Sequence, residues 1–270
     1  MARKLLNGSE LAGFVKQRQA KQVRMLRQAH GIMPKLVIVM SQNAGEVIAT
    51  YVRMKQAYGA DILVEVQVVA CAQGEMLAAI EQANRDDSVH GIILQLPIDD
   101  PAGTEDLVNA IAPAKDVDGL GKDAQFMSAT AEAIDWLLAG YSVTLEGKHI
   151  TLLGNGKLVG RPLAEMWHQA GHDVTVLDRT SQDIDQVLLG SDVIVSATGQ
   201  PRILHDGNVP RNAIVVDAGT VSEEGRIIGD AAPELQVRQD LVITPPKGGV
   251  GPLTVVVLFD HVIQTCLAQV

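Results

Sequence analysis

The fold is decided by the stretch HITLLGNGKLVGRP, which occupies residues 149–162. Its first five residues predict a buried strand, and the segment that follows Gly160 predicts a helix. Between them lies the glycine turn Gly154-Asn155-Gly156, which would let the backbone approach a pyrophosphate at the amino end of the helix. The spacing is GxGxxxG instead of GxGxxG, so the motif alone fits an ordinary tight turn equally well.

Short apolar runs rich in β-branched residues recur on both sides of this stretch and predict buried parallel strands. These runs cover residues 36–40, 62–69, 91–94, 150–153, 174–177, 193–195, 214–216 and 242–243. Helical spacing lies between most of them, at residues 46–58 closed by Gly59, 75–83, 105–111, and 158–169 closed by Gly171. The alternation of strand and helix predicts an α/β protein.

Two domains are expected. Residues 119–147 lack strand character and contain a predicted helix around 132–139, so this segment is expected to join them. We assign residues 1–120 to a first α/β domain and residues 121–252 to a Rossmann-type, doubly wound parallel sheet, with an active-site cleft between the two. An amphipathic pattern at residues 253–267 predicts a last helix.

The composition excludes several classes of protein. The chain has 270 residues, of which 47% are hydrophobic, enough for two medium domains with ample cores. A net charge of −10 disfavours nucleic acid and anionic membranes as partners. Cys71 and Cys266 show no metal-ligand or redox spacing, so reduced thiols and no metal site are expected. Residues 1–16 predict neither a signal peptide nor a membrane span, so a cytoplasmic location is expected.

The strand after the glycine turn ends at Asp178, where a Rossmann fold commonly places an acid that holds a ribose 2'-hydroxyl. This position favours NAD. Two alternatives stay open at this point, since Arg179 could bind a 2'-phosphate and Asp178 could cap the segment after Thr180.

Two further loops follow predicted strands of the second domain. They read Ala197-Thr198-Gly199 and Asp217-Ala218-Gly219. Both would open at the carboxyl edge of the sheet, where Rossmann folds bind their ligands, although simple turn glycines explain them as well.

In the first half, Tyr51 and Lys55 are four residues apart on a predicted helix and therefore share one face. A lysine serves proton transfer when burial lowers its pKa from about 10.4, and the flanking Tyr51, Met54 and Tyr58 could supply that burial. A solvated surface lysine is the ordinary alternative.

Two loop segments offer further polar groups to the first domain. Gln95-Leu96-Pro97 ends a strand, and KDVDG at residues 115–119 follows the next helix. Loops on a rigid sheet often carry chemistry, although a charged surface turn is the plain reading of residues 115–119.

Taken together, these stretches resemble the bifunctional methylenetetrahydrofolate dehydrogenase/cyclohydrolase family over nearly the whole chain. The resembling pieces are YVRMK at 51–55, GIILQLP at 91–97, KDVDG at 115–119, LVGRP at 158–162, Gly229-Asp230, and GGVGPLT at 248–254. The last piece is the most specific. The resemblance implies oxidation of 5,10-methylenetetrahydrofolate with NADP or NAD, and hydrolysis of the methenyl product to 10-formyltetrahydrofolate.

The resemblance also implies roles for individual residues. Tyr51 and Lys55 would line the folate cleft as catalytic residues, with Gln95 beside the lysine and Asp118 binding the pterin. Further folate contacts are implied for Leu96, Pro97, Gly251 and Pro252. The implied cofactor site comprises Gly154, Asn155, Gly156, Val159, Gly160, Pro162, Asp178, Arg179, Thr180, Ala197, Thr198, Gly199, Gly219, Thr220 and Thr254. Helix 253–270 would complete the first, folate-binding domain, and the family is usually a homodimer.

The chain departs from the family pattern at several positions. Ile48 stands where the family usually has serine, and QFMSAT at residues 125–130 stands where a Pro-Cys-Thr-Pro segment is not recognisable. Asn155-Gly156 replaces a common Arg-Ser, and Asp178 replaces the serine before the arginine. These two changes predict a weakened NADP preference. Pro246-Lys247 replaces Val-Pro.

Two other functions remain as alternatives. One is a different two-domain dehydrogenase, acting on shikimate or on another pterin carrier, which could use the same kind of cofactor domain. The other is a folate- or nucleotide-binding paralogue without catalysis, which the missing Pro-Cys-Thr-Pro and serine features would suit.

Overall fold

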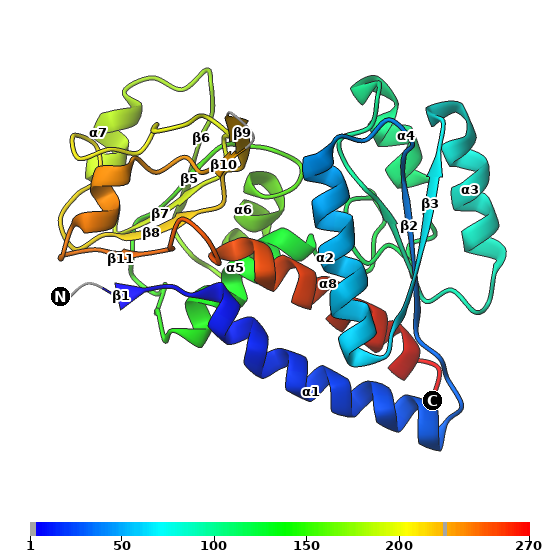
Figure 1. The fold of residues 1–270 in the computed structure, drawn as a ribbon. Helices are drawn as coiled ribbons and strands as arrows, with labels where there is room; N and C mark the ends of the chain where they lie inside the picture. Colours follow the sequence, from blue (N-terminus) through cyan, green and yellow to red (C-terminus); the bar gives the residue numbers. More distant parts are fainter. Residues whose placement is uncertain (1–3, 224–225) are drawn as a thin grey trace. The chain divides into compact units, whose positions relative to one another are not determined.

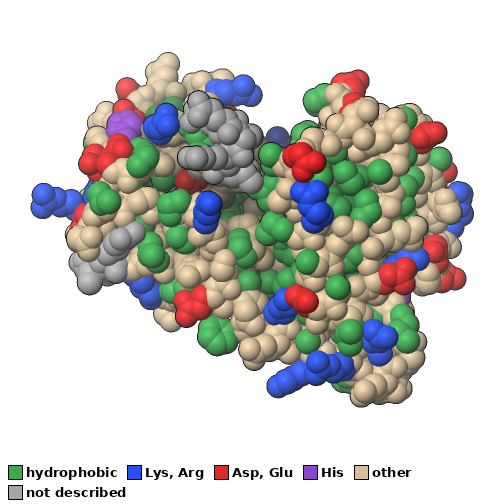
Figure 2. Space-filling model, viewed as in Figure 1, with side chains coloured by type: hydrophobic (Ala, Val, Ile, Leu, Met, Phe, Trp, Pro, Cys, Tyr) green, Lys and Arg blue, Asp and Glu red, His purple; other side chains and the backbone are tan. Residues whose placement is uncertain are grey.

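The computed structural model describes residues 4–223 and 226–270, so residues 1–3 of the N-terminal segment lie outside the described residues. The chain forms two compact units (Figure 1). The six-stranded unit comprises Met1–Ala12 and Thr130–Thr254, and the three-stranded unit comprises Gly13–Ala129 and Val255–Val270. Figure 2 shows acidic and basic side chains interspersed over the visible face.

The three-stranded unit is built on a parallel sheet with the strand order β3-β2-β4. Its strands are β2 (Lys35–Ser41), β3 (Glu65–Cys71) and β4 (Gly91–Leu94). Its helices are α1 (Gly8–Ala29, which begins in the other unit), α2 (Glu46–Ile62), α3 (Gln73–Arg85) and α4 (Thr104–Asn109), preceded by the short 3₁₀ helix η1 (Pro101–Gly103). In Figure 1, α3 lies on one side of β2 and β3, and α2 lies on the other.

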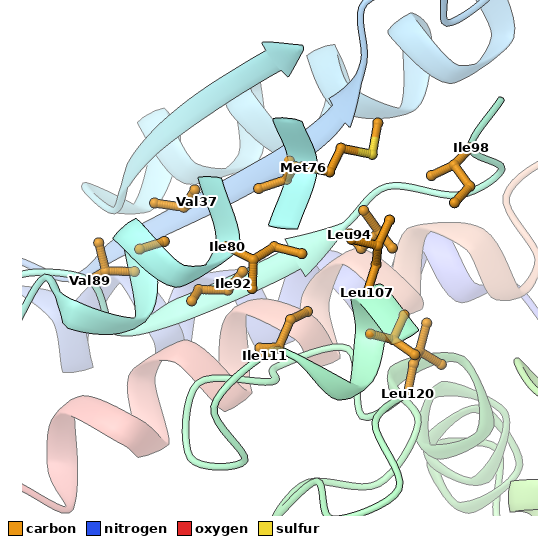
Figure 3. Packing of buried hydrophobic residues seen from close by; sticks show 13 residues of the cluster. Val37, Met76, Ile80, Val89, Ile92, Leu94, Ile98, Leu107, Ile111 and Leu120 are labelled. Atoms are coloured by element: carbon orange, nitrogen blue, oxygen red, sulfur yellow. The ribbon is translucent and has the colours of Figure 1, made fainter. Parts of the chain in front are cut away.

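Side chains alternate between the two faces of this sheet, as expected for buried parallel strands. Figure 3 shows Ile92 and Leu94 of β4 packed with Met76 and Ile80 of α3. On the opposite face, a Cβ at Gly91 would come within 2.8 Å of the Val262 side chain of α8 (Val250–Leu267). Helices therefore cover both faces of the sheet.

The prediction that Gly59 closes the second helix is wrong. Helix α2 runs through Gly59 to Ile62, so β3 begins at Glu65 and not at residue 62 as predicted. Leu63 ends the helix with a left-handed φ of 65°, and its N–H donates to the carbonyls of Ala60 and Gly59. Gly59 instead permits close packing, because a Cβ there would lie 2.5 Å from the Val66 side chain.

The six-stranded unit contains the predicted doubly wound parallel sheet, with the strand order β1-β11-β8-β7-β5-β6. The strands are β1 (Lys4–Leu5), β5 (Ile150–Leu153), β6 (Val174–Leu177), β7 (Val193–Ser196), β8 (Ile214–Asp217) and β11 (Val242–Ile243). From β5 the chain adds β6 on one side and then returns to add β7 on the other. The order therefore reverses between β5 and β7, and ligands of such sheets bind at that point of the carboxyl edge.

Helices and a two-stranded antiparallel sheet complete this unit. They are α5 (Ala129–Gly140), α6 (Gly160–Gln169), α7 (Ile184–Leu189), the paired strands β9 (Val221–Glu223) and β10 (Arg226–Ile228), and η2 (Pro233–Val237). Trp167 of α6 is buried and donates a 2.9 Å hydrogen bond to Asp135 of α5, which joins these two helices. As predicted, Gly171 follows α6, with a φ of +84°.

Among the described residues, one helix is both long enough and apolar enough to span a membrane. This helix is α8, with a mean hydropathy of 1.6. By length and composition alone it could cross a bilayer. In the structure 67% of it is buried against the protein, as in the core helix of a globular domain.

Candidate active site

The three-stranded unit holds a buried lysine on the face of α2 that carries Tyr51. Lys55 is only 9% exposed, and its Nζ donates a 2.6 Å hydrogen bond to Oε1 of Gln95. Gln95 directly follows β4, and its Nε2 donates to the carbonyl of Leu96 at 3.0 Å. Because the amide nitrogen is held by that carbonyl, the amide oxygen faces the lysine.

The burial of Lys55 changes its proton affinity. Desolvation lowers the pKa of the amine below its ordinary value, and the nearby Asp118 carboxylate partly opposes this shift. Tyr51 is half-buried, and burial raises the pKa of its phenol. Of the flanking residues considered from the sequence, Met54 is 42% exposed, and Tyr58 packs on Phe259 at a ring-centroid distance of 5.1 Å.

The segment KDVDG is not the charged surface turn considered from the sequence. Lys115 donates from Nζ to the carbonyls of Ala83, Asn84 and Asp86 at 3.2, 2.9 and 2.8 Å, so it caps the carboxyl end of α3. Asp116 is buried and accepts hydrogen bonds from the backbone N–H groups that follow it, those of Gly119, Leu120 and Gly121.

These two structural residues fix the backbone on either side of Asp118. Burial raises the pKa of the Asp118 carboxyl to about 6. The charge of Asp116 adds to this rise, whereas Lys55 and His261 oppose it. The Asp118 carboxylate is thus electrostatically coupled to Lys55, which is hydrogen-bonded to Gln95. Three of the four predicted catalytic residues therefore interact in the structure.

Two residues near Asp118 were not predicted from the sequence as part of the site. His261 of α8 is buried, and its Nδ1 lies 2.8 Å from the carbonyl of Val117. Phe126 stacks on the His261 ring with a centroid distance of 4.4 Å. Phe126 belongs to the segment that stands where Pro-Cys-Thr-Pro is missing, so this segment packs on α8. A histidine within the apolar run of residues 255–263 was the available signal.

The remaining residues predicted to bind folate lie in both units. Leu96 is half-buried and Pro97 exposed after β4, and Ile48 is half-buried on α2. Gly251 is exposed and Pro252 half-buried in the first turn of α8, which belongs to the six-stranded unit. The glycines before this turn pack on the start of α1, because a Cβ at Gly248 would lie 2.6 Å from Oγ of Ser9.

The glycine turn of the six-stranded unit fits a dinucleotide. Gly154 has a φ of +109°, and a Cβ there would lie 2.7 Å from the carbonyl oxygen of Ala197. A Cβ at Gly160 would lie 1.7 Å from the carbonyl oxygen of Gly154. Gly156 is exposed, and nothing lies within 4 Å of its Cβ position. Two glycines thus permit close packing of the turn, and the third leaves open space for a phosphate.

The other residues of the turn support the start of α6. Asn155 is exposed, Val159 is buried as the residue before the helix, and Pro162 is half-buried in its first turn, where proline is tolerated. The helix begins at Gly160, two residues later than predicted.

Asp178 closes a turn at the end of β6. Its Oδ1 accepts hydrogen bonds from the N–H and the hydroxyl of Thr180 at 2.8 and 2.6 Å, and these bonds lower the pKa of the carboxyl. The residue does not cap a helix, because α7 begins later, at Ile184, after Asp183. Arg179 is exposed. A charged carboxylate therefore stands at the end of the strand beside β5.

The loops after β7 and β8 are tied to two carboxylates. The N–H and hydroxyl of Thr198 donate to Asp230, and the N–H of Gly219 donates to Asp217. Gly199 has a φ of +65°, and Thr220 is exposed. Thr254 is half-buried in the first part of α8. Among the described residues, no group of three or more His, Cys, Asp or Glu could hold a metal ion.

Two family models match the chain: the catalytic domain of tetrahydrofolate dehydrogenase/cyclohydrolase over residues 6–118, and its NAD(P)-binding domain over residues 128–270. The bifunctional protein FolD of Staphylococcus epidermidis is 32% identical over 283 aligned residues, covering 100% of this chain and 97% of that protein. The bifunctional FolD structure from Campylobacter jejuni superposes with a TM-score of 0.93 at 30% identity, covering 100% of both chains. A Trypanosoma brucei FolD, complexed with NADP cofactor and inhibitor, gives a TM-score of 0.89 at 26% identity, covering 100% and 99%.

Proposed function

Because this chain belongs to the tetrahydrofolate dehydrogenase/cyclohydrolase family, we propose how its own residues carry out the family's two reactions. The protein oxidises 5,10-methylenetetrahydrofolate with a nicotinamide dinucleotide and hydrolyses the methenyl product to 10-formyltetrahydrofolate. A shikimate-type dehydrogenase and a non-catalytic paralogue, the alternatives considered from the sequence, are not favoured.

Lys55 is the proton carrier of the hydrolysis. The methenyl carbon is an electrophile, so a water molecule adds to it and must lose a proton as the new C–O bond forms. The neutral amine of Lys55 accepts this proton and returns one to the folate nitrogen that leaves the carbon. The observation that carries this assignment is the buried Lys55 amine, with a lowered pKa, held 2.6 Å from Gln95.

Gln95 and Tyr51 prepare that lysine and the space around it. The amide oxygen of Gln95 accepts a hydrogen bond from the amine, which holds the amine in one place through the reaction. Tyr51 lies one helical turn before Lys55, and its half-buried ring shapes the side of the site along α2. A phenol whose pKa is raised by burial stays neutral and serves as a hydrogen-bond donor.

Asp118 anchors the pterin. An ionised carboxylate accepts hydrogen bonds from the N–H groups of a pterin ring, and such charge-assisted bonds are stronger than neutral ones. The pKa of about 6 makes Asp118 ionised at neutral pH. Lys115 and Asp116 give the loop a fixed backbone from which this carboxylate is presented. Leu96 and Pro97, which follow Gln95 after β4, provide further folate contacts in this proposal.

The six-stranded unit binds the dinucleotide through the glycine turn and the loops after β6, β7 and β8. A dinucleotide held there would supply the hydride acceptor for the bridging methylene carbon of the folate. The residues of this chain orient the two reactants and provide no acid or base for that step. Gly156 and the amino end of α6 receive the pyrophosphate, and Thr198, Gly199, Gly219, Thr220 and Thr254 form the remaining contacts.

The chain prefers NAD to NADP in this proposal. The Asp178 carboxylate is ionised, and it suits a ribose 2'-hydroxyl, whereas it repels a 2'-phosphate. Asn155 and Gly156 offer no positive charge to such a phosphate. Arg179 follows Asp178 directly in the chain, and its exposed position leaves it surrounded by water.

We further propose a homodimer in the cytoplasm. Both cysteines are free thiols, and Cys266 is buried, which suits a reducing compartment. Light scattering after size exclusion measures the assembly directly, and a mass of one chain would contradict the dimer.

A single spectrophotometric assay tests the proposed function. Methylenetetrahydrofolate is mixed with NAD or NADP, and the formation and decay of the methenyl product are followed in time. Formation is expected with both dinucleotides and faster with NAD, and decay is expected to yield the formyl product. Absence of dinucleotide-dependent formation would contradict the proposal.

A further inference from the structure

We propose that Asp230 is a positioning residue for the dinucleotide, which it serves by holding the loop Ala197-Thr198-Gly199 at the carboxyl end of β7. The inference rests on the proposed placement of the dinucleotide at this edge of the sheet. Asp230 itself has no accessible surface, so its influence on a ligand would pass through the loop that it holds.

One oxygen of Asp230 gathers the end of β7 and the loop behind it. Oδ2 accepts a 2.6 Å hydrogen bond from the hydroxyl of Ser196, the last residue of the strand. The same oxygen accepts bonds from the N–H of Thr198 at 2.8 Å and from its hydroxyl at 2.9 Å. Three donors on a buried carboxylate oxygen fix this loop more firmly than neutral hydrogen bonds would.

Asp230 and Asp217 are placed by a reciprocal arrangement of acids and glycines. Asp217 ends β8 and accepts hydrogen bonds from the N–H groups of Gly219, Asp230 and Ala231 at 3.0, 3.0 and 2.9 Å. A Cβ at Gly219 would lie 2.1 Å from the Asp230 carboxylate, and a Cβ at Gly229 would lie 2.1 Å from the Asp217 carboxylate. Each acid therefore occupies the space that a glycine beside the other acid leaves free.

The loop that Asp230 holds also forms one wall of the glycine turn. Strands β5 and β7 are neighbours, and the strand order reverses between them. Gly154 packs so closely on Ala197 that a Cβ would lie 2.7 Å from the Ala197 carbonyl oxygen. A shift of the Thr198 loop would move that carbonyl and disturb the turn proposed to receive the pyrophosphate.

The second oxygen of the Asp230 carboxylate has a different environment from the first. Oδ1 is buried and has no hydrogen-bond partner in the described structure. It faces Gly219, where only a residue without a side chain leaves room for it. One carboxylate oxygen therefore packs against Gly219 without a hydrogen bond, which lowers the stability of the fold, and the other oxygen holds the loop.

The experiment compares Asp230→Ala, Asp230→Asn and a matched control in the full chain. The control is Asp192→Ala, because the Asp192 carboxylate also accepts a backbone N–H, that of His149, at 2.9 Å, but lies at the opposite end of the sheet. Binding of reduced dinucleotide is measured by its fluorescence, and methenyltetrahydrofolate hydrolysis, which uses no dinucleotide, is measured on the same samples. Thermal unfolding gives Tm for each variant.

We expect Asp230→Ala to lose affinity for the dinucleotide while it keeps its hydrolysis activity. For Asp230→Ala, the dinucleotide Kd rises about tenfold or more, since three charge-assisted hydrogen bonds are lost. Asp230→Asn keeps an oxygen that can accept these bonds and should restore part of the affinity. Hydrolysis should stay within about twofold of wild type in both, and Asp192→Ala should bind like wild type.

Two results would overturn the proposal. One is a dinucleotide Kd in folded Asp230→Ala within about twofold of wild type. The other is a parallel fall of dinucleotide binding, hydrolysis and Tm, which would make Asp230 a purely structural residue. If Asp230→Ala does not fold, Ser196→Ala removes one of the three donors, and an unchanged Kd in that variant would equally contradict the proposal. A wild-type chain that binds no dinucleotide would instead contradict the proposed site.

Discussion

The amine of Lys55 donates a 2.6 Å hydrogen bond to the amide oxygen of Gln95, a residue 40 positions later in the chain. The two side chains come from helix α2 and from the carboxyl end of strand β4. The bond ties the proposed proton carrier to the rigid sheet. Because both ends are fixed, the lysine is pre-organised for proton transfer.

Replacing Gln95 with leucine tests this relationship. The glutamine oxygen stabilises the protonated amine, so its loss should lower the pKa of Lys55 further and weaken its hold on the proton. The rate of methenyl hydrolysis should fall about tenfold, and the acid limb of its pH profile should move to lower pH.

A matched control for this variant is Gln73→Leu. Gln73 forms hydrogen bonds with the backbone of Asp100 in the same unit. This change should leave the pH profile of hydrolysis where it is. An unchanged profile in Gln95→Leu would show that the amide does not act on the lysine.

Asp118→Asn is expected to weaken folate binding and to change the pH dependence of stability. The folded-state pKa of about 6 lies above the ordinary value of 3.8, so the folded protein favours the protonated carboxyl. Asp118 therefore lowers stability as pH rises from about 4 to about 6, and this penalty persists above that range. Removing the charge should raise Tm at pH 8 and leave it nearly unchanged at pH 4.

The same substitution should raise the folate KM at pH 8, where the wild-type carboxylate is ionised. In wild type, KM should fall as pH rises through about 6, and in Asp118→Asn this dependence should be absent. Steady-state kinetics between pH 5 and pH 8 check both statements. A variant with wild-type KM and an intact pH dependence would remove Asp118 from the pterin site.

Asp178→Ser should shift the dinucleotide preference towards NADP. The substitution removes the charge that repels a 2'-phosphate and leaves a hydroxyl beside Arg179. The ratio of kcat/KM for NADP to that for NAD should rise about tenfold. Asp173→Ser, at the other end of β6, serves as the control, and equal ratios in both variants would show that Asp178 does not select the dinucleotide.

Gly59→Ala should destabilise the protein, although alanine is the better helix former. A Cβ at this position would meet the Val66 side chain at 2.5 Å and the Val64 carbonyl oxygen at 3.0 Å. The cost is expected to be about 1 to 3 kcal/mol in the free energy of unfolding. Denaturant titration measures it.

The control for this prediction is Gly13→Ala, in the second turn of α1. Nothing lies within 4 Å of its Cβ position, so alanine should stabilise the helix by about 0.5 to 1 kcal/mol. Opposite signs in the two variants support close packing at Gly59. A gain in both would contradict it.

The sequence predicted the strands better than the first helix. Buried parallel strands read as continuous apolar runs, and those at β4, β5, β6 and β11 begin and end where they were predicted. Helix α1 was missed because its buried face includes a polar residue. Gln19 has no exposed surface, and it reaches the carbonyl of Val256 and the carboxylate of Asp260. A contact with a helix more than 200 residues away leaves no local pattern.

In the candidate site too, features set by local spacing were predictable from the sequence, and contacts between distant residues were not. The spacing of Tyr51 and Lys55 was readable, because four residues make about one helical turn. The roles of Asp230 and His261 were not readable from spacing, since their partners Thr198 and Val117 lie far away in the sequence. Gly229-Asp230 was noticed as part of a family resemblance, but its hydrogen bonds depend on the folded sheet.

The most direct test of the proton-carrier assignment is the rate of methenyltetrahydrofolate hydrolysis by Lys55→Met. Methionine keeps most of the buried volume and removes the amine, so the rate should fall by about a hundredfold or more while the dinucleotide Kd stays unchanged. Lys16→Met, which removes a lysine paired with Asp61 on the surface of the same unit, should hydrolyse like wild type. A Lys55→Met protein that hydrolyses the methenyl compound at the wild-type rate would contradict the account.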